Sequence, residues 1–188
     1  MPGAAFNIIA EIATDQHGYV TQKDARAAGV AAWTLARMAE RGTIERVSQG
    51  VYRVPLIPAG ALDEYMQASL WPRDVRGVLS HQTALELHGL SDVNPAKIHL
   101  SVPRAHRIQR QVPKLYVVHR ADLSGEQVTA LEDIPIVTPA RAVLECFDAG
   151  LGPALIAQAI DDGRRRGVFS KRQAEQLRRE TEIREVDR

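Results

Sequence analysis

The sequence has almost no cysteine: Cys146 is the single thiol in 188 residues. One thiol cannot form an intrachain disulfide, which excludes the disulfide frameworks of small secreted domains and favours a reducing compartment. No apolar run approaches the roughly 18–20 residues needed to span a bilayer. The N-terminal segment has no basic n-region, and Glu11 interrupts its apolar residues, so it predicts an amphipathic helix rather than a signal peptide. We therefore expect a cytoplasmic protein without membrane contact.

Aromatic residues are scarce, and neither sign of charge is in large excess. Aromatics make up 5% of the chain and hydrophobic residues as a whole 45%, so we expect a core of Ala, Val, Leu and Ile. The formal net charge of +1 excludes the overall basicity of a non-specific DNA coat. It does not exclude a local basic face.

Motifs for catalysis and metal binding are absent as well. The sequence contains no HExxH, no cysteine pair, no GxSxG, no Walker A motif and no Gly-Ser motif followed by paired carboxylates. His81 and His88 would share a helix face but lie two turns apart, too far to chelate one ion directly. Cys146 falls in an apolar helix and is expected to be a buried, inert thiol. We expect neither enzymatic activity nor a cofactor nor a metal.

Residues 1–57 contain the pattern of three short helices followed by a hairpin. Apolar spacing predicts a first helix over 4–14, and Thr21 with Asp24 forms a capping box for a second that ends at Gly29. A third helix covers 31–41 and stops at Gly42, and two strands follow at 43–47 and 51–54. The segment 19–20 is long enough only for a small strand. This order is typical of a winged helix-turn-helix domain.

The third helix and the hairpin carry most of the candidate DNA contacts. Trp33, Arg37 and Arg41 fall largely on the face opposite the core, where a helix in the major groove reaches base edges. The start of the second helix offers backbone N–H groups and a cation to phosphate, and the hairpin would lie over the DNA backbone. The candidates are Thr21, Gln22, Lys23, Trp33, Thr34, Arg37, Arg41, Arg46, Ser48, Gln49 and Arg53.

Other interpretations of this domain stay open. Winged helices also serve as protein-docking modules, and the same element order occurs in other small folds. Trp33 is alternatively a core or dimer residue, and Arg37 and Arg41 are alternatively only solvated. Residues 1–57 contain six Lys and Arg against five Asp and Glu, which weakens the DNA interpretation without removing it.

Residues 60–188 predict a second, mixed α/β domain with a small sheet and C-terminal helices, so the expected fold class is α+β. Strands are predicted in 97–103, 114–121 and 132–139, and helices over 139–150, 153–166 and from 170 onward. Ser80 and Ser170 are predicted helix caps.

A basic loop joins the first two of these strands. No acidic residue occurs between Val93 and Ala121, and the loop carries a candidate second basic patch of Arg104, Arg107, Arg110 and Lys114. The patch would contact nucleic-acid phosphates or an acidic partner, or else the segment is a solvated hairpin loop. A further basic run at 164–166 would be neutralised locally by the preceding Asp161 and Asp162.

Short stretches along the chain, taken in order, resemble the AbiEi family of antitoxins. In the first domain they are Gly29-Val30, Arg41-Gly42 and Gly50-Val51-Tyr52-Arg53, around the recognition helix and the wing. In the second they are LSHQTALELHGL, IHLSVPR, VVHRADL and IPIVTPARAVLECFD. The resemblance covers most of residues 17–150. It implies a winged helix that contacts DNA and a C-terminal antitoxin domain.

Antitoxins of this family neutralise a nucleotidyltransferase-like toxin of the AbiEii type, and many repress their own operon by binding upstream repeats. The resemblance therefore implies a cognate toxin and double-stranded operator DNA as partners, with a homodimer on the DNA. Many related chains continue into a Vsr-like endonuclease domain, and no candidate nuclease core follows residue 180. The alternatives are a stand-alone winged-helix transcriptional regulator and the remnant of a nuclease fusion.

Overall fold

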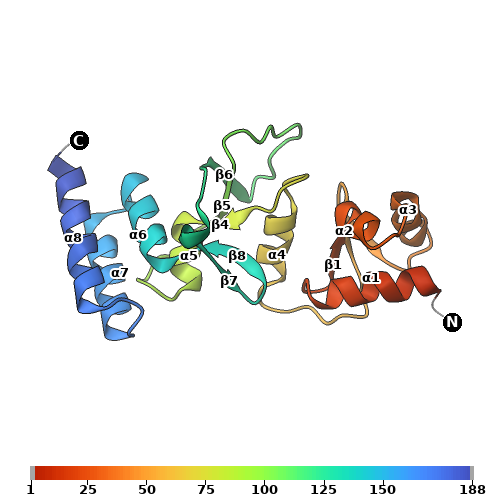
Figure 1. The fold of residues 1–188 in the computed structure, drawn as a ribbon, viewed down its shortest axis with the longest axis horizontal. Helices are drawn as coiled ribbons and strands as arrows, with labels where there is room; N and C mark the ends of the chain where they lie inside the picture. The colour runs from red at the N-terminus through yellow and green to blue at the C-terminus, as the bar shows by residue number, and fades with distance from the viewer. Residues whose placement is uncertain (1–2, 187–188) are drawn as a thin grey trace. The chain divides into compact units, whose positions relative to one another are not determined.

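The computed structural model describes residues 3–186, with side chains described up to Glu182. The chain folds into two compact units, which are drawn in Figure 1. Unit 1 runs to Gly77 and includes Glu132–Ile134, and unit 2 comprises Val78–Leu131 and the residues from Pro135 onward. The expected domain boundary near residue 57 stays a prediction. The fold is α+β, as expected.

Unit 1 contains the winged helix-turn-helix. Its elements are α1 (Ala4–Thr14), β1 (Tyr19–Thr21), α2 (Gln22–Ala27), α3 (Ala32–Glu40), β2 (Glu45–Ser48), β3 (Val51–Arg53) and α4 (Asp63–Leu70). The three strands form one antiparallel sheet in the order β1-β3-β2. The predicted helices and hairpin are confirmed, and the small strand at Tyr19 supplies the third member of the sheet.

Apolar residues at helical spacing explain why these elements close on one another. Ile9 of α1, Leu35 of α3 and Tyr52 of β3 are all fully buried in a single cluster. The chain reverses between α2 and α3 at Gly29, whose φ of 79° lies in the left-handed region that a side chain would disfavour. The packed core fixes α3 so that its other face is turned to solvent.

Unit 2 is a mixed sheet with helices. Its elements are β4 (Val78–Leu79), α5 (His81–Leu87), β5 (Ile98–Val102), β6 (Tyr116–Arg120), the 3₁₀ helix η1 (Gly125–Gln127), β7 (Val128–Leu131), β8 (Ile134–Val137), α6 (Pro139–Asp148), α7 (Pro153–Arg165) and α8 (Lys171–Val186). The sheet order is β6-β5-β4-β8-β7. Strand β4 pairs antiparallel with β5, whereas β5 with β6 and β4 with β8 are parallel. Helices α5, α6, α7 and α8 pack successively against one another.

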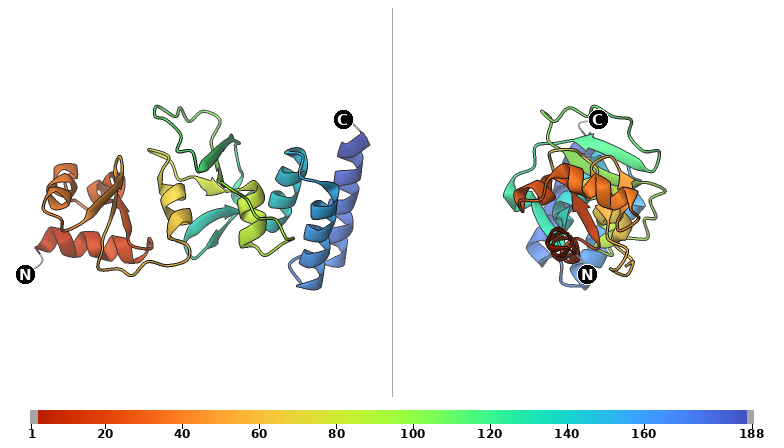
Figure 2. Two further views of the ribbon diagram at one scale, coloured as in Figure 1. Left: turned by 180° about the vertical axis from the view of Figure 1, so that it is seen from behind. Right: turned by 90° about the vertical axis from the view of Figure 1, so that its right-hand side faces the viewer.

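Two sequence-based expectations for unit 2 were wrong in detail. The basic loop cannot be a hairpin, because β5 and β6 run parallel and the chain must cross back between them. Figure 2 shows this loop, 103–114, projecting beyond the strands that it joins. Ser80 occupies the N-cap position of α5 but makes no side-chain cap hydrogen bond, since its hydroxyl accepts from Ser101 Oγ at 2.9 Å instead.

The predicted cap at Ser170 is confirmed. Gln173 N donates to Ser170 Oγ at 3.2 Å, and Ser170 N donates to Gln173 Oε1 at 2.9 Å, so the two residues form a capping box. Among the described residues, no helix is both long enough and apolar enough to cross a membrane.

Candidate nucleic-acid interface

The exposed face of α3 is the centre of the candidate interface. The Trp33 side chain is 65% exposed, which excludes the alternative of a core residue. Arg37 and Arg41 are exposed as well, and the spacing of four residues places them with Trp33 along one side of the helix. Thr34, one residue after Trp33, is half-buried. Leu35 on the opposite side is fully buried, as expected.

The N-terminus of α3 has no side-chain cap. Ala31 holds the N-cap position and offers no oxygen to the first N–H groups of the helix. In an α-helix these first N–H groups lack intrahelical partners and carry the positive end of the helix dipole. The end of α3 that carries Trp33 therefore has no side-chain cap, although the backbone N–H of Thr34 donates to Ala31 O at 2.9 Å.

Three of the candidate arginines are free to meet an external anion. Arg37, Arg41 and Arg46 are exposed, and none has an ion pair or a side-chain hydrogen bond within the described part of the chain. Lys23 is also exposed, and its Nζ donates only to the backbone oxygen of Asp74 at 3.1 Å. These four side chains supply the positive charge that the nearly neutral composition of the domain does not reveal.

The start of α2 is tied into the domain. Thr21 caps the helix through a capping box with Asp24, which confirms that prediction, and its Oγ1 also donates to Asp24 Oδ2 at 2.7 Å. Gln22 Nε2 donates to the Tyr52 hydroxyl at 3.4 Å. Both side chains are half-buried. Because of these hydrogen bonds, their polar atoms already have partners inside the unit.

The four candidate residues of the wing differ in their exposure and in their hydrogen-bond partners. Arg46 and Gln49 are exposed on β2 and at the turn. Arg53 on β3 instead points to the interior of unit 1, where its Nη2 donates to Ile57 O at 3.0 Å and pairs with Asp63 Oδ2 at 3.5 Å. Ser48 Oγ is buried and has no hydrogen-bond partner among the described residues. Of the four wing candidates, the structure exposes two.

The second basic patch is exposed in part. Arg104, Arg107 and Lys114 are exposed and Arg110 is half-buried. Arg104 lies 4.0 Å from the carboxylate of Asp122, and its backbone N donates to the same carboxylate at 3.0 Å. Arg120 holds the loop through its Nη1, which donates to His106 O at 2.7 Å and Arg104 O at 3.2 Å.

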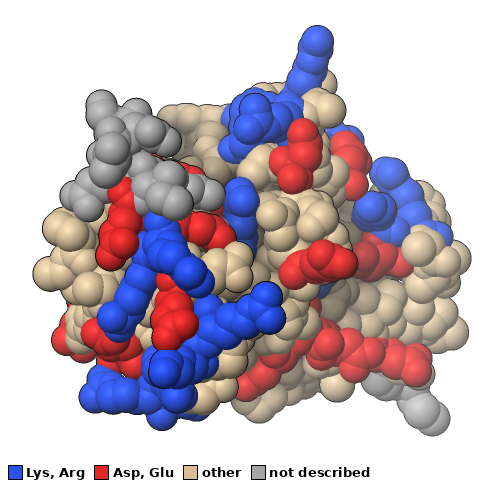
Figure 3. Space-filling model, turned by 60° about the vertical axis from the view of Figure 1, so that its left-hand side comes forward, with Lys and Arg blue, Asp and Glu red and all other residues tan. Residues whose placement is uncertain are grey.

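The basic run at 164–166 is neutralised only in part by the two aspartates that precede it. Arg165 pairs with Asp162, and Asp161 pairs with Arg178 of α8. Arg166 donates to the carbonyl oxygens of His88 and Gly89. Figure 3 shows basic side chains interleaved with acidic ones over the end of the molecule formed by α7 and α8. The described side chains of this surface therefore do not form a patch of a single charge sign.

One group of residues was not predicted from the sequence. His81 was expected to share a helix face with His88, but the structure brings His81 together with His99 and His119. His88 lies apart from them and places its Nε2 2.8 Å from Val137 O. The alternation of side chains along each strand could have assigned His99 and His119 to one face of its own strand. Whether the two residues become neighbours depends on the register between the strands, which no local pattern encodes.

Comparisons with known proteins relate the N-terminal domain to one family. Residues 7–55 match the family model described as "Transcriptional regulator, AbiEi antitoxin". No curated protein matches the chain. Among solved structures, the RV2827C protein from Mycobacterium tuberculosis is 16% identical, over 94% of this chain and 72% of that chain, with a TM-score of 0.48. The winged helix-turn-helix of this protein is similar to the AbiEi antitoxin family of transcriptional regulators, the family that its sequence resembles.

Proposed function

We propose that the winged helix binds double-stranded operator DNA upstream of its own gene and represses transcription. The observation that carries this proposal is the solvent face of α3, where an exposed Trp33 stands beside two arginines without partners among the described residues. A role in the core of the domain would leave the Trp33 side chain covered. The family of residues 7–55, whose description names transcriptional regulators, supports the same conclusion.

The candidate contacts divide by chemistry. Trp33, Thr34, Arg37 and Arg41 would lie near base edges in the major groove, since α3 is the helix that a winged helix-turn-helix inserts. Lys23, Arg46 and Gln49 would contact phosphates from α2 and the wing. Two copies of the chain would occupy the two half-sites of an inverted repeat.

The remaining candidates have a different role in this proposal. Thr21, Gln22 and Arg53 bind other groups of unit 1 through their side chains. Ser48 Oγ is shielded from solvent. We propose that these four residues shape the domain, and that any DNA contact at Thr21 and Gln22 is made by the backbone N–H groups of α2.

Fluorescence anisotropy tests the proposal directly. The purified chain is titrated onto its own upstream DNA and onto a scrambled duplex of the same composition, at two salt concentrations. Specific recognition predicts tighter binding to the native duplex that persists at the higher salt. Equal binding to both duplexes that salt removes would leave only a contact with the phosphate backbone, and the proposal would fail.

Matched variants locate the contacts. Arg37→Ala should weaken operator binding by about 1–3 kcal/mol and relax sequence preference, whereas Lys23→Ala should weaken binding to both duplexes and lower the salt slope by about 1. Arg26→Ala is the control, because Arg26 is an exposed cation of α2 outside the candidate set. Unchanged operator affinity in Arg37→Ala would reject the base-reading role of this helix.

For unit 2 we propose the antitoxin role: it binds and silences a nucleotidyltransferase-like toxin and carries out no catalysis. The support is the family of the adjoining domain, whose description names antitoxins. Co-expression with the product of the neighbouring gene tests it. Rescue of growth together with co-purification is expected, and a neighbouring product that is neither toxic nor bound would refute it.

A second candidate is a stand-alone transcriptional regulator without a toxin partner. It is favoured by the extent of the family match, which ends at residue 55 and leaves unit 2 unmatched. Under this alternative unit 2 would mediate dimerisation. Specific operator binding together with the absence of any bound neighbouring product would select it over the antitoxin.

A further inference from the structure

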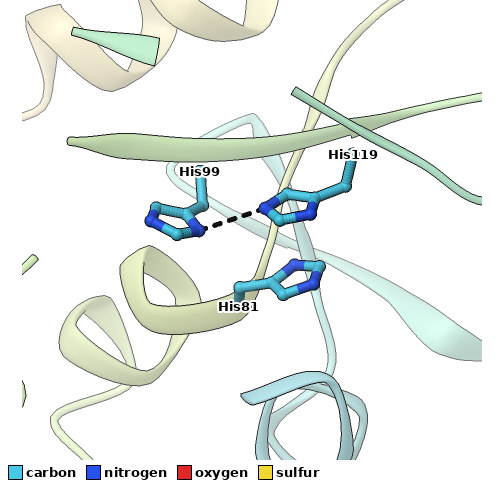
Figure 4. Close-up of side chains that lie close together, drawn as sticks. All are labelled: His81, His99 and His119. Atoms are coloured by element: carbon cyan, nitrogen blue, oxygen red, sulfur yellow. Dashed lines mark hydrogen bonds between the residues drawn. The ribbon is translucent and has the colours of Figure 1, made fainter. Parts of the chain in front are cut away.

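Three histidines of unit 2 converge from three different elements. His81 begins α5, His99 lies in β5 and His119 lies in β6, and Figure 4 shows their rings turned toward one another. Each ring offers one nitrogen such that the three atoms all lie within 4.8 Å of one another. Three imidazoles from separate segments at this separation form a donor set suited to a divalent transition metal.

The parallel pairing of β5 and β6 brings two of the rings together. In the register of these strands His99 is opposite Val117 and Ser101 is opposite His119, so His99 and His119 lie on the same face of the sheet. Their nitrogens Nδ1 and Nε2 are 3.1 Å apart. Two nitrogens bound to one tetrahedral zinc at the usual bond length would be separated by about 3.3 Å. The pair is therefore already near the spacing that a shared metal requires.

His81 approaches this pair from α5 and has a carboxylate behind it. Its ring stacks on that of His119, with centroids 3.5 Å apart. Its Nδ1 is hydrogen-bonded to Ser80 Oγ at 3.1 Å and lies 3.4 Å from Oε2 of Glu145, whose side chain is only 5% exposed. Histidines that bind metals generally donate their second ring N–H to such a carboxylate, which fixes the tautomer. With the proton on Nδ1, the His81 lone pair is on Nε2.

The carboxylate of Glu145 is itself positioned. Arg141 Nε donates to its Oε1 at 2.8 Å, and the backbone N of His81 donates to its Oε2 at 3.2 Å. The second of these bonds holds His81 at a φ of 53°, a left-handed conformation that is uncommon outside glycine. A buried carboxylate of α6 thus fixes the backbone and one ring nitrogen of the residue that begins α5.

Buried hydroxyls support the cluster on its inner side. Ser80 and Ser101 hydrogen-bond to each other, and Thr83 Oγ1 accepts from His99 N at 2.9 Å. All three residues are at most 1% exposed. Their bonds to the neighbours of the rings hold β5 and α5 at a constant separation.

The rings are neutral at physiological pH, which is the form that binds metals. Burial, followed by the neighbouring histidine His99, lowers the pKa of His81 to about 4. Burial, followed by His81 and His99, lowers the pKa of His119 to about 4 as well. Burial also lowers the pKa of His99. All three side chains keep partial exposure, which gives a hydrated ion access.

We propose that His81, His99 and His119 form a binding site for one Zn²⁺ ion, with Glu145 as the buried carboxylate that positions His81 by accepting from its backbone N–H and lying beside its ring. On binding, the His81 and His119 rings turn out of their stacked arrangement so that their lone pairs converge. The proton shared between His99 and His119 moves to the outer nitrogen of its own ring, so neutral imidazoles bind without net proton release. Three protein ligands leave a fourth position for water or a partner's side chain.

The first test uses the untagged full chain after treatment with a chelator. Titration calorimetry with Zn²⁺ should give one site per chain, and Co²⁺ should give the visible absorption of a tetrahedral nitrogen-ligated ion. Because the site joins β5, β6 and α5 only in the folded state, Zn²⁺ should raise the melting temperature. Absence of saturable Zn²⁺ binding by the wild-type chain would overturn the proposal.

Variants then locate the ion. His99→Gln and His119→Gln should each abolish the stoichiometric site, and Glu145→Gln should weaken it by about 10–100-fold. His106→Gln, which changes a histidine of the 103–114 loop, is the matched control and should bind as the wild type does. Full binding in both His99→Gln and His119→Gln, or loss in His106→Gln, would place the ion elsewhere and refute the assignment.

A measurement on the wild-type chain tests the assignment of the ligands without relying on variants that fold correctly. X-ray absorption at the zinc edge should show three imidazole nitrogens around the ion. A spectrum dominated by oxygen ligands would contradict the site even if the affinity were high.

Discussion

A glycine in the last turn of α7 provides a sharp test of the packing of unit 2. In an ordinary helix interior, replacing glycine by alanine stabilises the fold by about 1 kcal/mol, because the unfolded chain loses freedom. Gly163 should behave in the opposite way. A Cβ at this position would clash with Cδ2 and Cε2 of the Phe169 ring, because both would lie closer than Cβ atoms approach other atoms in proteins.

The magnitude follows from the two ways to relieve this clash. Phe169 is 2% exposed, so moving its ring into solvent would forfeit about 1.5–3 kcal/mol of burial. Shifting α7 instead strains the packing by about 1–3 kcal/mol. After subtraction of the helix-propensity gain, Gly163→Ala should destabilise the protein by up to about 2 kcal/mol.

Urea unfolding followed by circular dichroism measures the effect, and a double-mutant cycle identifies its cause. Phe169→Val removes the δ and ε ring atoms that the new methyl group would meet. In that background Gly163→Ala should become neutral or stabilising, although Phe169→Val itself lowers stability. A stabilising Gly163→Ala in the wild-type chain, or the same loss in both backgrounds, would refute the reasoning.

Three further predictions concern stability and reactivity. Leu35→Ala removes a fully buried side chain beneath α3 and should cost about 2–5 kcal/mol of unfolding free energy in urea titrations; a loss well below this range would mean that the core under α3 is loose. Thr21→Ala breaks the capping box with Asp24 and should cost about 1 kcal/mol in the same assay, and an unchanged midpoint would show that the cap contributes nothing. Burial raises the pKa of the Cys146 thiol to about 12, so a thiol reagent at pH 8 should label the protein only after unfolding in urea; rapid labelling of the folded chain would contradict the burial.

The winged helix-turn-helix was predictable because its signals are local. A capping box at Thr21, a glycine after each of α2 and α3, and apolar residues at helical spacing each specify an element within a few residues of chain. The exposure of Trp33 followed from the same spacing, since the burial of Leu35 determines which face of α3 is left to solvent. For this domain, the sequence by itself determined the order of elements and the outward face of the recognition helix.

Side-chain partners between distant segments could not be predicted in the same way. Arg53 was expected at phosphate, yet it pairs with Asp63 of α4, and Ser80 was expected to cap α5, yet Glu145 of α6 accepts the N–H of His81. These partners are 10 and 64 residues apart in the chain. Local propensity carries no information about which carboxylate will be near.

The histidine cluster is a feature that only the tertiary structure determines. Composition determined that the chain could have no disulfide and no standard zinc motif, because such motifs need cysteines or closely spaced histidines in the sequence itself. The convergence of His81, His99 and His119 depends instead on the parallel register of β5 and β6 and on the packing of α5 across them. Pairing of strands is set by the free energy of the whole sheet and its helices rather than by any one segment, so only the folded chain brings these three rings to one place.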